Sequence, residues 1–81
     1  MNNKMQKKLA YIYCQEILNR ELNSYDFADI DSWIENYDGD SLKNCIIDLM
    51  IKSKKGEITI YSTNYINNYL KSNCQLAKYW D

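Results

Sequence analysis

The chain is almost free of helix-breaking residues, with no proline and only two glycines, Gly39 and Gly56, among 81 residues. Both glycines stand between segments whose apolar residues recur at helical spacing, which predicts helices joined by short connections. Hydrophobic residues make up 46 % of the chain, enough for one small core. We therefore expect a single domain over residues 1–81, folded as an all-α, compact bundle of four to five helices.

The first two predicted helices are amphipathic. The first covers residues 4–22, with a broad apolar arc and an i, i+4 pair of Glu16 and Arg20 on another face. The second begins at a cap residue, Ser24 or Asp26, and ends at the first glycine. Its acidic residues are expected to face outward. The stripe that we expect it to bury consists of Phe27, Ile30, Trp33, Ile34 and Tyr37.

The third predicted helix is the most apolar. It begins at Ser41, with Asp40 as an alternative cap, and ends in lysines before Gly56, where positive charge complements the helix dipole. Residues 57–60 alternate like a strand without a partner strand, so we interpret them as an extended connection packed on the bundle. Apolar residues cover more than half of the helix circumference, which predicts a central position in the bundle. They are Leu42, Cys45, Ile46, Ile47, Leu49, Met50 and Ile51.

The fourth predicted helix starts at a cap, Ser62 or Thr63, and extends as far as Trp80. No residue after the cap forces a break. At about 100° per residue, its apolar side chains share one face. That face includes Tyr65, Ile66, Tyr69, Leu70, Leu76, Ala77 and Trp80.

Residue types used in metal and covalent chemistry are sparse. The chain has no histidine, and its three cysteines, Cys14, Cys45 and Cys74, are widely spaced. We therefore expect no zinc site, disulfide framework or Cys–His nucleophile, and interpret the cysteines as small, buried or half-buried hydrophobic residues. Phosphate-loop, nucleophile-elbow and zinc-protease motifs are also missing. The prediction is a non-enzymatic chain without metal or cofactor.

Membrane insertion is not expected either. No apolar run approaches the roughly 20 residues that cross a bilayer. The apolar stretch after the basic N-terminal residues is broken at once by Gln15 and Glu16, so it cannot form a signal-peptide core. A cytoplasmic location follows as the expectation.

Charge is distributed unevenly along the chain. Residues 21–42 contain seven acids and no base, whereas the remainder carries ten bases against four acids. Such polarity can steer a basic partner to one side of the molecule. The partner-binding candidates on the second helix are Asp29, Asp31, Glu35 and Asp38.

Two helical segments resemble a known family. Residues 27–37 follow the pattern ΦxxIxxWIxxY, and residues 65–71, about thirty positions downstream, read YINNYLK. A mostly apolar helix and a short polar connection lie between them. In this order the segments resemble DnaD-like replication domains, whose last helix opens YIxxILKxW, and the resemblance covers roughly residues 22–73. It implies a compact helical module of the kind found in primosome proteins and in replication initiators of plasmids and phages of low-GC bacteria.

The resemblance also implies candidate DNA-binding positions. In the family, a tyrosine, an aliphatic residue and a tryptophan spaced four apart are implicated in binding single-stranded DNA. The matching positions here are Tyr65, Tyr69 and Asn73, so the tyrosine is retained, the aliphatic residue is replaced and the tryptophan is absent. Trp80 lies seven residues after Asn73 on the same predicted face and would partly substitute for the lost stacking surface. The lysine candidates for phosphate contact are Lys52, Lys54, Lys55 and Lys71.

Three functional hypotheses follow. The first is an adaptor in replication initiation that binds a primase, helicase or helicase loader, because a pI near 5.3 favours a protein partner over DNA. The second is a single-stranded DNA-binding module acting through Tyr65, Tyr69 and the lysines. The third is a small phage or plasmid effector whose acidic run mimics DNA and inhibits a host nucleic-acid enzyme. Monomer or homo-oligomer, and full-length protein or excised C-terminal domain, both stay open.

Overall fold

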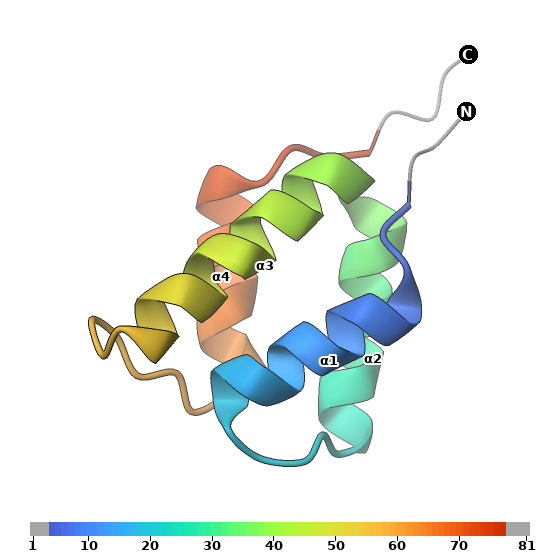
Figure 1. Cartoon of the computed structure of the whole chain (residues 1–81). Coiled ribbons are helices and arrows are strands. Elements are labelled where there is room, and N and C mark those ends of the chain that lie inside the picture. The colour runs from blue at the N-terminus through green and yellow to red at the C-terminus, as the bar shows by residue number, and fades with distance from the viewer. Residues whose placement is uncertain (1–3, 78–81) are drawn as a thin grey trace.

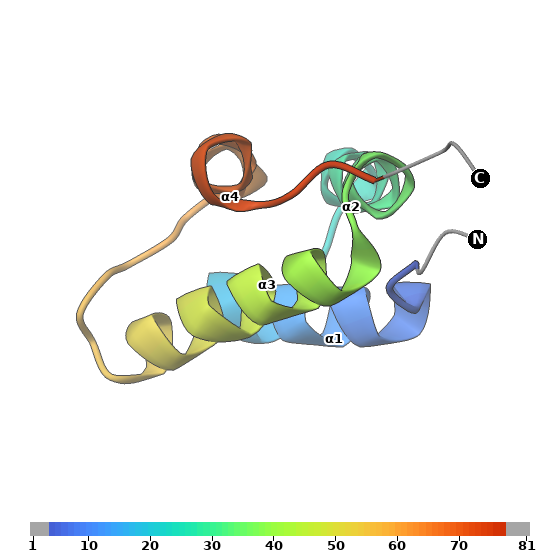
Figure 2. The same ribbon diagram turned by 90° about the horizontal axis from the view of Figure 1, so that it is seen from above.

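The computed structural model describes residues 4–77 (Figure 1). These residues form four helices, α1 (Lys7–Leu18), α2 (Ser24–Asn36), α3 (Gly39–Lys54) and α4 (Thr63–Asn73), and no strand longer than an isolated bridge. The predicted all-α class is confirmed. Seen from above, α1 and α3 lie side by side in one layer, and α2 and α4 form a second layer that crosses it steeply (Figure 2).

The core lies between the two layers and centres on α3, which packs against each of the other three helices. Its Leu42, Ile46 and Leu49 are at most 1 % exposed, and they meet Ile30 of α2 and Ile66 and Leu70 of α4, all fully buried. Burying an aliphatic side chain of this size contributes about 1.5–3 kcal/mol. The central position predicted for the third helix is therefore confirmed.

Helix ends depart from the prediction by a few residues. Asn23, one position before the predicted cap, caps α2: its side chain accepts from the Asp26 backbone N–H at 3.0 Å, and the Asp26 carboxylate accepts from the Asn23 N–H at 2.9 Å. Asp38 caps α3 by accepting from the Ser41 N–H at 3.0 Å, so neither Ser41 nor Asp40 is the cap. The expectation that α2 ends at Gly39 is wrong, because Gly39 is already the first residue of α3.

α1 is shorter than the predicted residues 4–22, because Asn19 adopts a left-handed backbone, φ 55°, that ends the helix after Leu18. Gly56 follows Lys55, the cap residue at the end of α3, and has φ 78°, the left-handed conformation expected of a glycine in that position. After it, residues 57–60 form a connection without helix or strand, and Ile60, 3 % exposed, anchors it to the core. That packed connection agrees with the prediction.

The prediction that the fourth helix extends to Trp80 is wrong. α4 ends at Asn73, and Cys74 has extended backbone angles. The next residues run against the corner between α2 and α3: the Asp38 N–H donates to the Gln75 carbonyl and the Ala77 N–H to the Asn36 carbonyl, both at 2.9 Å. These tertiary hydrogen bonds replace helical ones that local periodicity favoured. Trp80 lies outside the described residues.

Two smaller predictions also fail. Phe27 is 38 % exposed and packs edge-on against Tyr11, with ring centroids 4.8 Å apart, because it sits at the rim of the α1–α2 contact. The Glu16–Arg20 pair does not form; Glu16 pairs with Lys54 of α3, and Arg20 with Asp26.

Within the part of the chain that the structure describes, no helix is long and apolar enough to cross a membrane.

Candidate interaction surface

Tyr65, Tyr69 and Asn73 follow one another along α4 at intervals of four residues, so each is displaced only about 40° around the helix from the last. The neighbouring Ile66 and Leu70 are fully buried and hold this stripe at the edge of the core. Tyr65 is 44 % exposed, Tyr69 is half-buried and Asn73 is exposed. The stripe therefore starts at the surface and is partly covered by α3 at its centre.

α3 meets the stripe through a carboxylate. The Tyr69 hydroxyl donates to the Asp48 carboxylate at 2.9 Å, and the Lys52 ammonium lies 3.2 Å from the same oxygen. Burial and this hydrogen bond raise the pKa of Tyr69 to about 12, whereas the hydrogen bonds from Tyr69 and Lys52 lower the pKa of Asp48. We call these residues the tyrosine face. It comprises Asp48, Lys52, Tyr65, Tyr69 and Asn73.

Asn73 has a structural task at the end of this face. Its side-chain amide donates to the Tyr69 carbonyl at 2.9 Å, and its own carbonyl accepts from the Cys45 thiol at 3.7 Å. The Cys45 thiol thereby gives a partner to the Asn73 carbonyl, one of the four that the end of α4 leaves without helical partners. Asn73 thus closes the helix at the position where the family's tryptophan would offer a flat ring.

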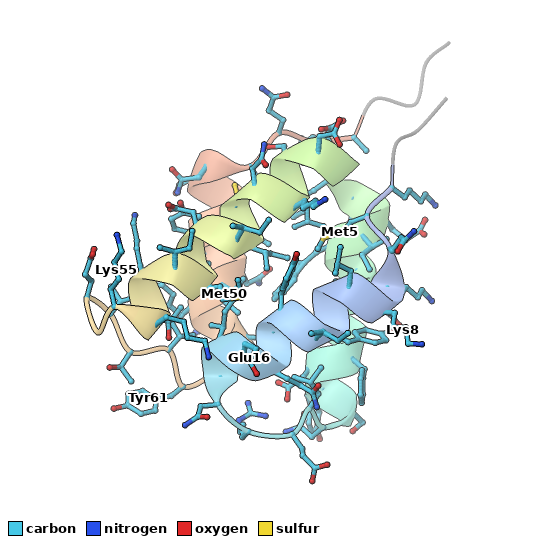
Figure 3. All side chains as sticks on the ribbon, viewed as in Figure 1. Met5, Lys8, Glu16, Met50, Lys55 and Tyr61 are labelled. Atoms are coloured by element: carbon cyan, nitrogen blue, oxygen red, sulfur yellow. The ribbon has the colours of Figure 1, made fainter. Side chains whose placement is uncertain are left out.

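The four candidate lysines do not gather at one place. Lys52 belongs to the tyrosine face, whereas Lys54 points to α1 and pairs with Glu16. Lys55, beyond the last turn of α3, projects from the same side of the molecule as Tyr61 (Figure 3). Lys71 lies two residues after Tyr69, about 160° around α4 from it. The structure therefore links Lys52 to Tyr69 through Asp48, whereas Lys54 pairs with α1 and Lys71 lies on another side of α4.

The acidic side chains of α2 do not form the outward, solvated face that was expected. Asp29 accepts from the Thr63 hydroxyl of α4 at 2.6 Å, and Asp31 accepts from the Tyr11 hydroxyl of α1 at 2.5 Å. Glu35 is exposed and pairs with Lys4 at 2.8 Å. Asp38 is the cap of α3. These four acids tie α2 to its neighbours, so much of their charge is already partnered within the chain.

Two contacts of α2 were not foreseen from the sequence. Asp26 is 3 % exposed and receives the Arg20 guanidinium at 2.5 and 3.3 Å. The Trp33 indole N–H donates to the Asn67 side-chain carbonyl of α4 at 3.0 Å. The spacing of Asn23 and Asp26, an asparagine followed three residues later by an acid, is a capping-box signal that would have identified the cap of α2 but not the Arg20 partner of Asp26. The second joins residues 34 positions apart, beyond any local pattern.

A groove also opens at the α3–α4 connection, with a volume of about 460 Å³. The ends of α1 and α3 form its walls, and Glu16, Lys54 and Tyr61 stand among its lining residues. Tyr61 is 81 % exposed. No run of local sequence predicted this hollow, because its walls come from three separate segments.

The two thiols and the tyrosine hydroxyl at this surface, those of Cys45, Cys74 and Tyr69, are neutral donors at pH 7. Burial raises the pKa of Cys74 to about 11 and raises that of Cys45, as it does for Tyr69. Among residues 4–77, no three histidine, cysteine or acidic side chains are grouped closely enough to hold a metal ion. Partly exposed aromatic rings and neutral hydrogen-bond donors suit this surface to non-covalent recognition.

No protein-family model matches the chain, and no curated protein or solved structure shows significant similarity to it.

Proposed function

We propose that this chain is a DnaD-like, non-enzymatic adaptor of DNA replication initiation, which binds a replication protein such as a primase, a helicase or a helicase loader through the tyrosine face. The observation that carries the proposal is the Tyr65 ring, 44 % exposed, one helical turn before Tyr69, whose hydroxyl donates to a carboxylate that already has Lys52 as its counter-ion. Tyrosine is enriched among the residues that dominate binding energy at protein interfaces.

Charge favours a protein partner over nucleic acid. Lys52 is 3.2 Å from Asp48, and Lys54 is paired with Glu16, so two of the three lysines at the end of α3 are offset locally. A strand of DNA demands uncompensated positive charge along its backbone. A protein surface needs only complementary polar groups around an aromatic anchor.

The proposed partner-binding surface is therefore the tyrosine face and not the acids of α2. The second-helix acids Asp29, Asp31 and Asp38 hold the fold through Thr63, Tyr11 and the start of α3. A partner that recruited them would have to replace those contacts. A partner could instead contact the exposed Tyr65 ring without breaking the hydrogen bond between Tyr69 and Asp48.

The test is a binding titration by biolayer interferometry against purified primase, helicase and helicase loader from a low-GC bacterium. Tyr65→Ala should weaken binding of the true partner about tenfold or more, since an anchoring tyrosine contributes more than about 1.4 kcal/mol. Tyr25→Ala is the matched control: Tyr25 is 82 % exposed but belongs to α2. Equal affinities for the two variants, or no binding to any of the three proteins, would contradict the proposal.

Single-stranded DNA is the second candidate, and one observation favours it. Lys55 makes no ion pair within residues 4–77 and projects from the same side as Tyr61 (Figure 3). A cation beside an exposed ring can hold a phosphate and stack a base. Fluorescence anisotropy of a labelled oligonucleotide at about 50 and 200 mM salt decides, because phosphate-driven binding falls steeply with salt. Lys55→Gln and Tyr61→Ala should each reduce such binding, and absence of binding at both salt concentrations removes this candidate.

A further inference from the structure

Cys74 is held directly over one turn of α3. The residue before it, Asn73, accepts from the Cys45 thiol at 3.7 Å through its carbonyl. The residue after it, Gln75, donates its backbone N–H to the Ser41 hydroxyl at 3.0 Å. Ser41 and Cys45 are one helical turn apart, so the two bonds fix Cys74 against the side of α3 that carries Cys45.

The two thiols are neighbours in this arrangement. Cys45 and Cys74 are both half-buried and both pack against the core, and the Cys45 thiol donates to the carbonyl of Asn73, the residue directly before Cys74. All three cysteines are free thiols, and Cys14 is fully buried in α1. The chain therefore holds one neighbouring pair of thiols and one isolated thiol shielded from solvent, although their spacing in the sequence gave no sign of pairing.

We propose that Cys45 and Cys74 are a redox-modification site, which closes as a reversible intramolecular disulfide on reaction with an oxidised small-molecule disulfide such as oxidised glutathione. The bond would fasten the extended residues 74–77 to α3. These residues already contact the corner between α2 and α3 through backbone hydrogen bonds, so closure adds a covalent tie to an existing docking position. The inference is independent of which partner the tyrosine face binds.

The chemistry balances as two exchanges. The thiolate of one cysteine attacks a sulfur of the small disulfide, forming a mixed disulfide and releasing one small-molecule thiolate, which takes up the proton that the cysteine lost. The second cysteine then attacks the protein sulfur of the mixed disulfide and expels the second small thiol. Two protein thiols are oxidised and one small disulfide is reduced to two thiols. Excess reduced thiol reverses both steps.

Closure is expected to be slow near neutral pH. Burial raises the pKa of Cys74 to about 11 and raises that of Cys45, and the nearby groups Asp38, Tyr37, Asp48 and Tyr69 supply no positive charge that would favour a thiolate. The attacking species is the thiolate, whose fraction grows nearly tenfold per pH unit below the thiol pKa, so the rate should increase roughly a hundredfold between about pH 7 and pH 9.

Trypsin separates the three cysteines cleanly, because lysines and Arg20 place them in peptides 44–52, 72–78 and 9–20. We would incubate the folded chain with oxidised glutathione, block free thiols by alkylation at low pH and map the peptides by mass spectrometry. The expected product is a monomer lighter by two hydrogen atoms, with peptides 44–52 and 72–78 linked and Cys14 alkylated only after unfolding. Dithiothreitol should restore the starting mass.

Variants in which one of the three cysteines is replaced give the control. Cys45→Ser and Cys74→Ser should each stop at the mixed disulfide with glutathione, while Cys14→Ala should still close the pair. The oxidised wild-type chain should melt on the order of 10 °C higher than the reduced chain, because a crosslink between residues 45 and 74 restricts the unfolded state. Oxidation that yields only glutathione adducts, disulfide-linked dimers or a bond to Cys14 would overturn the proposal.

Discussion

Replacing Asp26 with asparagine should destabilise the fold more than any other single charge removal on α2. The Asp26 carboxylate is 3 % exposed and receives the Arg20 guanidinium and the Asn23 backbone N–H. An amide of the same shape has only one accepting oxygen, so one of these donors would face an NH2 group. The substitution therefore removes the charge and leaves a buried donor without its acceptor.

The expected loss of stability depends on how far Asp26 and Arg20 are exposed to solvent. Breaking a fully buried ion pair costs about 3–5 kcal/mol, but the Arg20 side chain is 36 % exposed and regains water. Hydrogen bonds to charged groups contribute about 1.5–3 kcal/mol, which places the loss near 2–3 kcal/mol. A domain of this size has a total stability of about 4–12 kcal/mol. The melting temperature should fall by roughly 10–20 °C.

Urea and thermal unfolding followed by circular dichroism at pH 7 would measure the change. Glu21→Gln is the matched control, because it removes the same charge nearby from an exposed side chain with no ion pair among residues 4–77. It should alter the free energy of unfolding by less than about 0.5 kcal/mol. If Asp26→Asn were no worse than Glu21→Gln, the reasoning from burial and hydrogen bonding would be refuted.

The pH dependence of stability gives an independent check on the role of Asp26. The Arg20 guanidinium and the Asn23 N–H hold the pKa of Asp26 below its ordinary value near 3.8. A carboxyl with a lowered pKa in the folded state stabilises the fold above the unfolded pKa, and that contribution is lost as pH falls through the folded pKa. The stability difference between wild type and Asp26→Asn should therefore be constant above about pH 5 and shrink at lower pH.

Three further outcomes can be measured by the same unfolding assays. Leu49→Ala, at a site 1 % exposed, should cost about 2–5 kcal/mol, while Ile51→Ala, at a site 44 % exposed, should cost much less. Gly56→Ala should cost about 1 kcal/mol through its φ of 78° alone, because a Cβ there would meet no atom within 4 Å; an unchanged midpoint would contradict this. Burial raises the pKa of Cys14 from 9.0 to about 12, so stability should fall above pH 9 by about 1.4 kcal/mol per pH unit, and Cys14→Ala should lack that part of the slope.

Local patterns were reliable where one helix face meets the core. The apolar positions of the third predicted helix placed it at the centre of the bundle, and Leu42, Ile46 and Leu49 are indeed buried there. The lysine-rich end before Gly56 and the packed connection after it were predicted as well. Hydrophobic periodicity and glycine position are properties of a few consecutive residues, so they can be interpreted without knowing the partner helices.

Side-chain partners across helices could not be predicted in this way. The acids Asp29 and Asp31 look solvated on a helical wheel, yet Thr63 and Tyr11 reach them from other helices. The Glu16–Arg20 pair was plausible by spacing, but in the folded chain Glu16 pairs with Lys54 and Arg20 pairs with Asp26. Which groups meet depends on crossing angles that no local spacing contains.

The sequence by itself determined that the chain forms a bundle of four to five helices around an apolar third one, because breaker placement and periodicity are local. Only the tertiary structure decided where the last helix stops. Residues 74–77 keep an amphipathic helical pattern, but the backbone of Asn36 and Asp38 and the hydroxyl of Ser41 offer them hydrogen bonds in an extended form. Those partners come from distant positions in the chain, and the same docking brings Cys74 to Cys45.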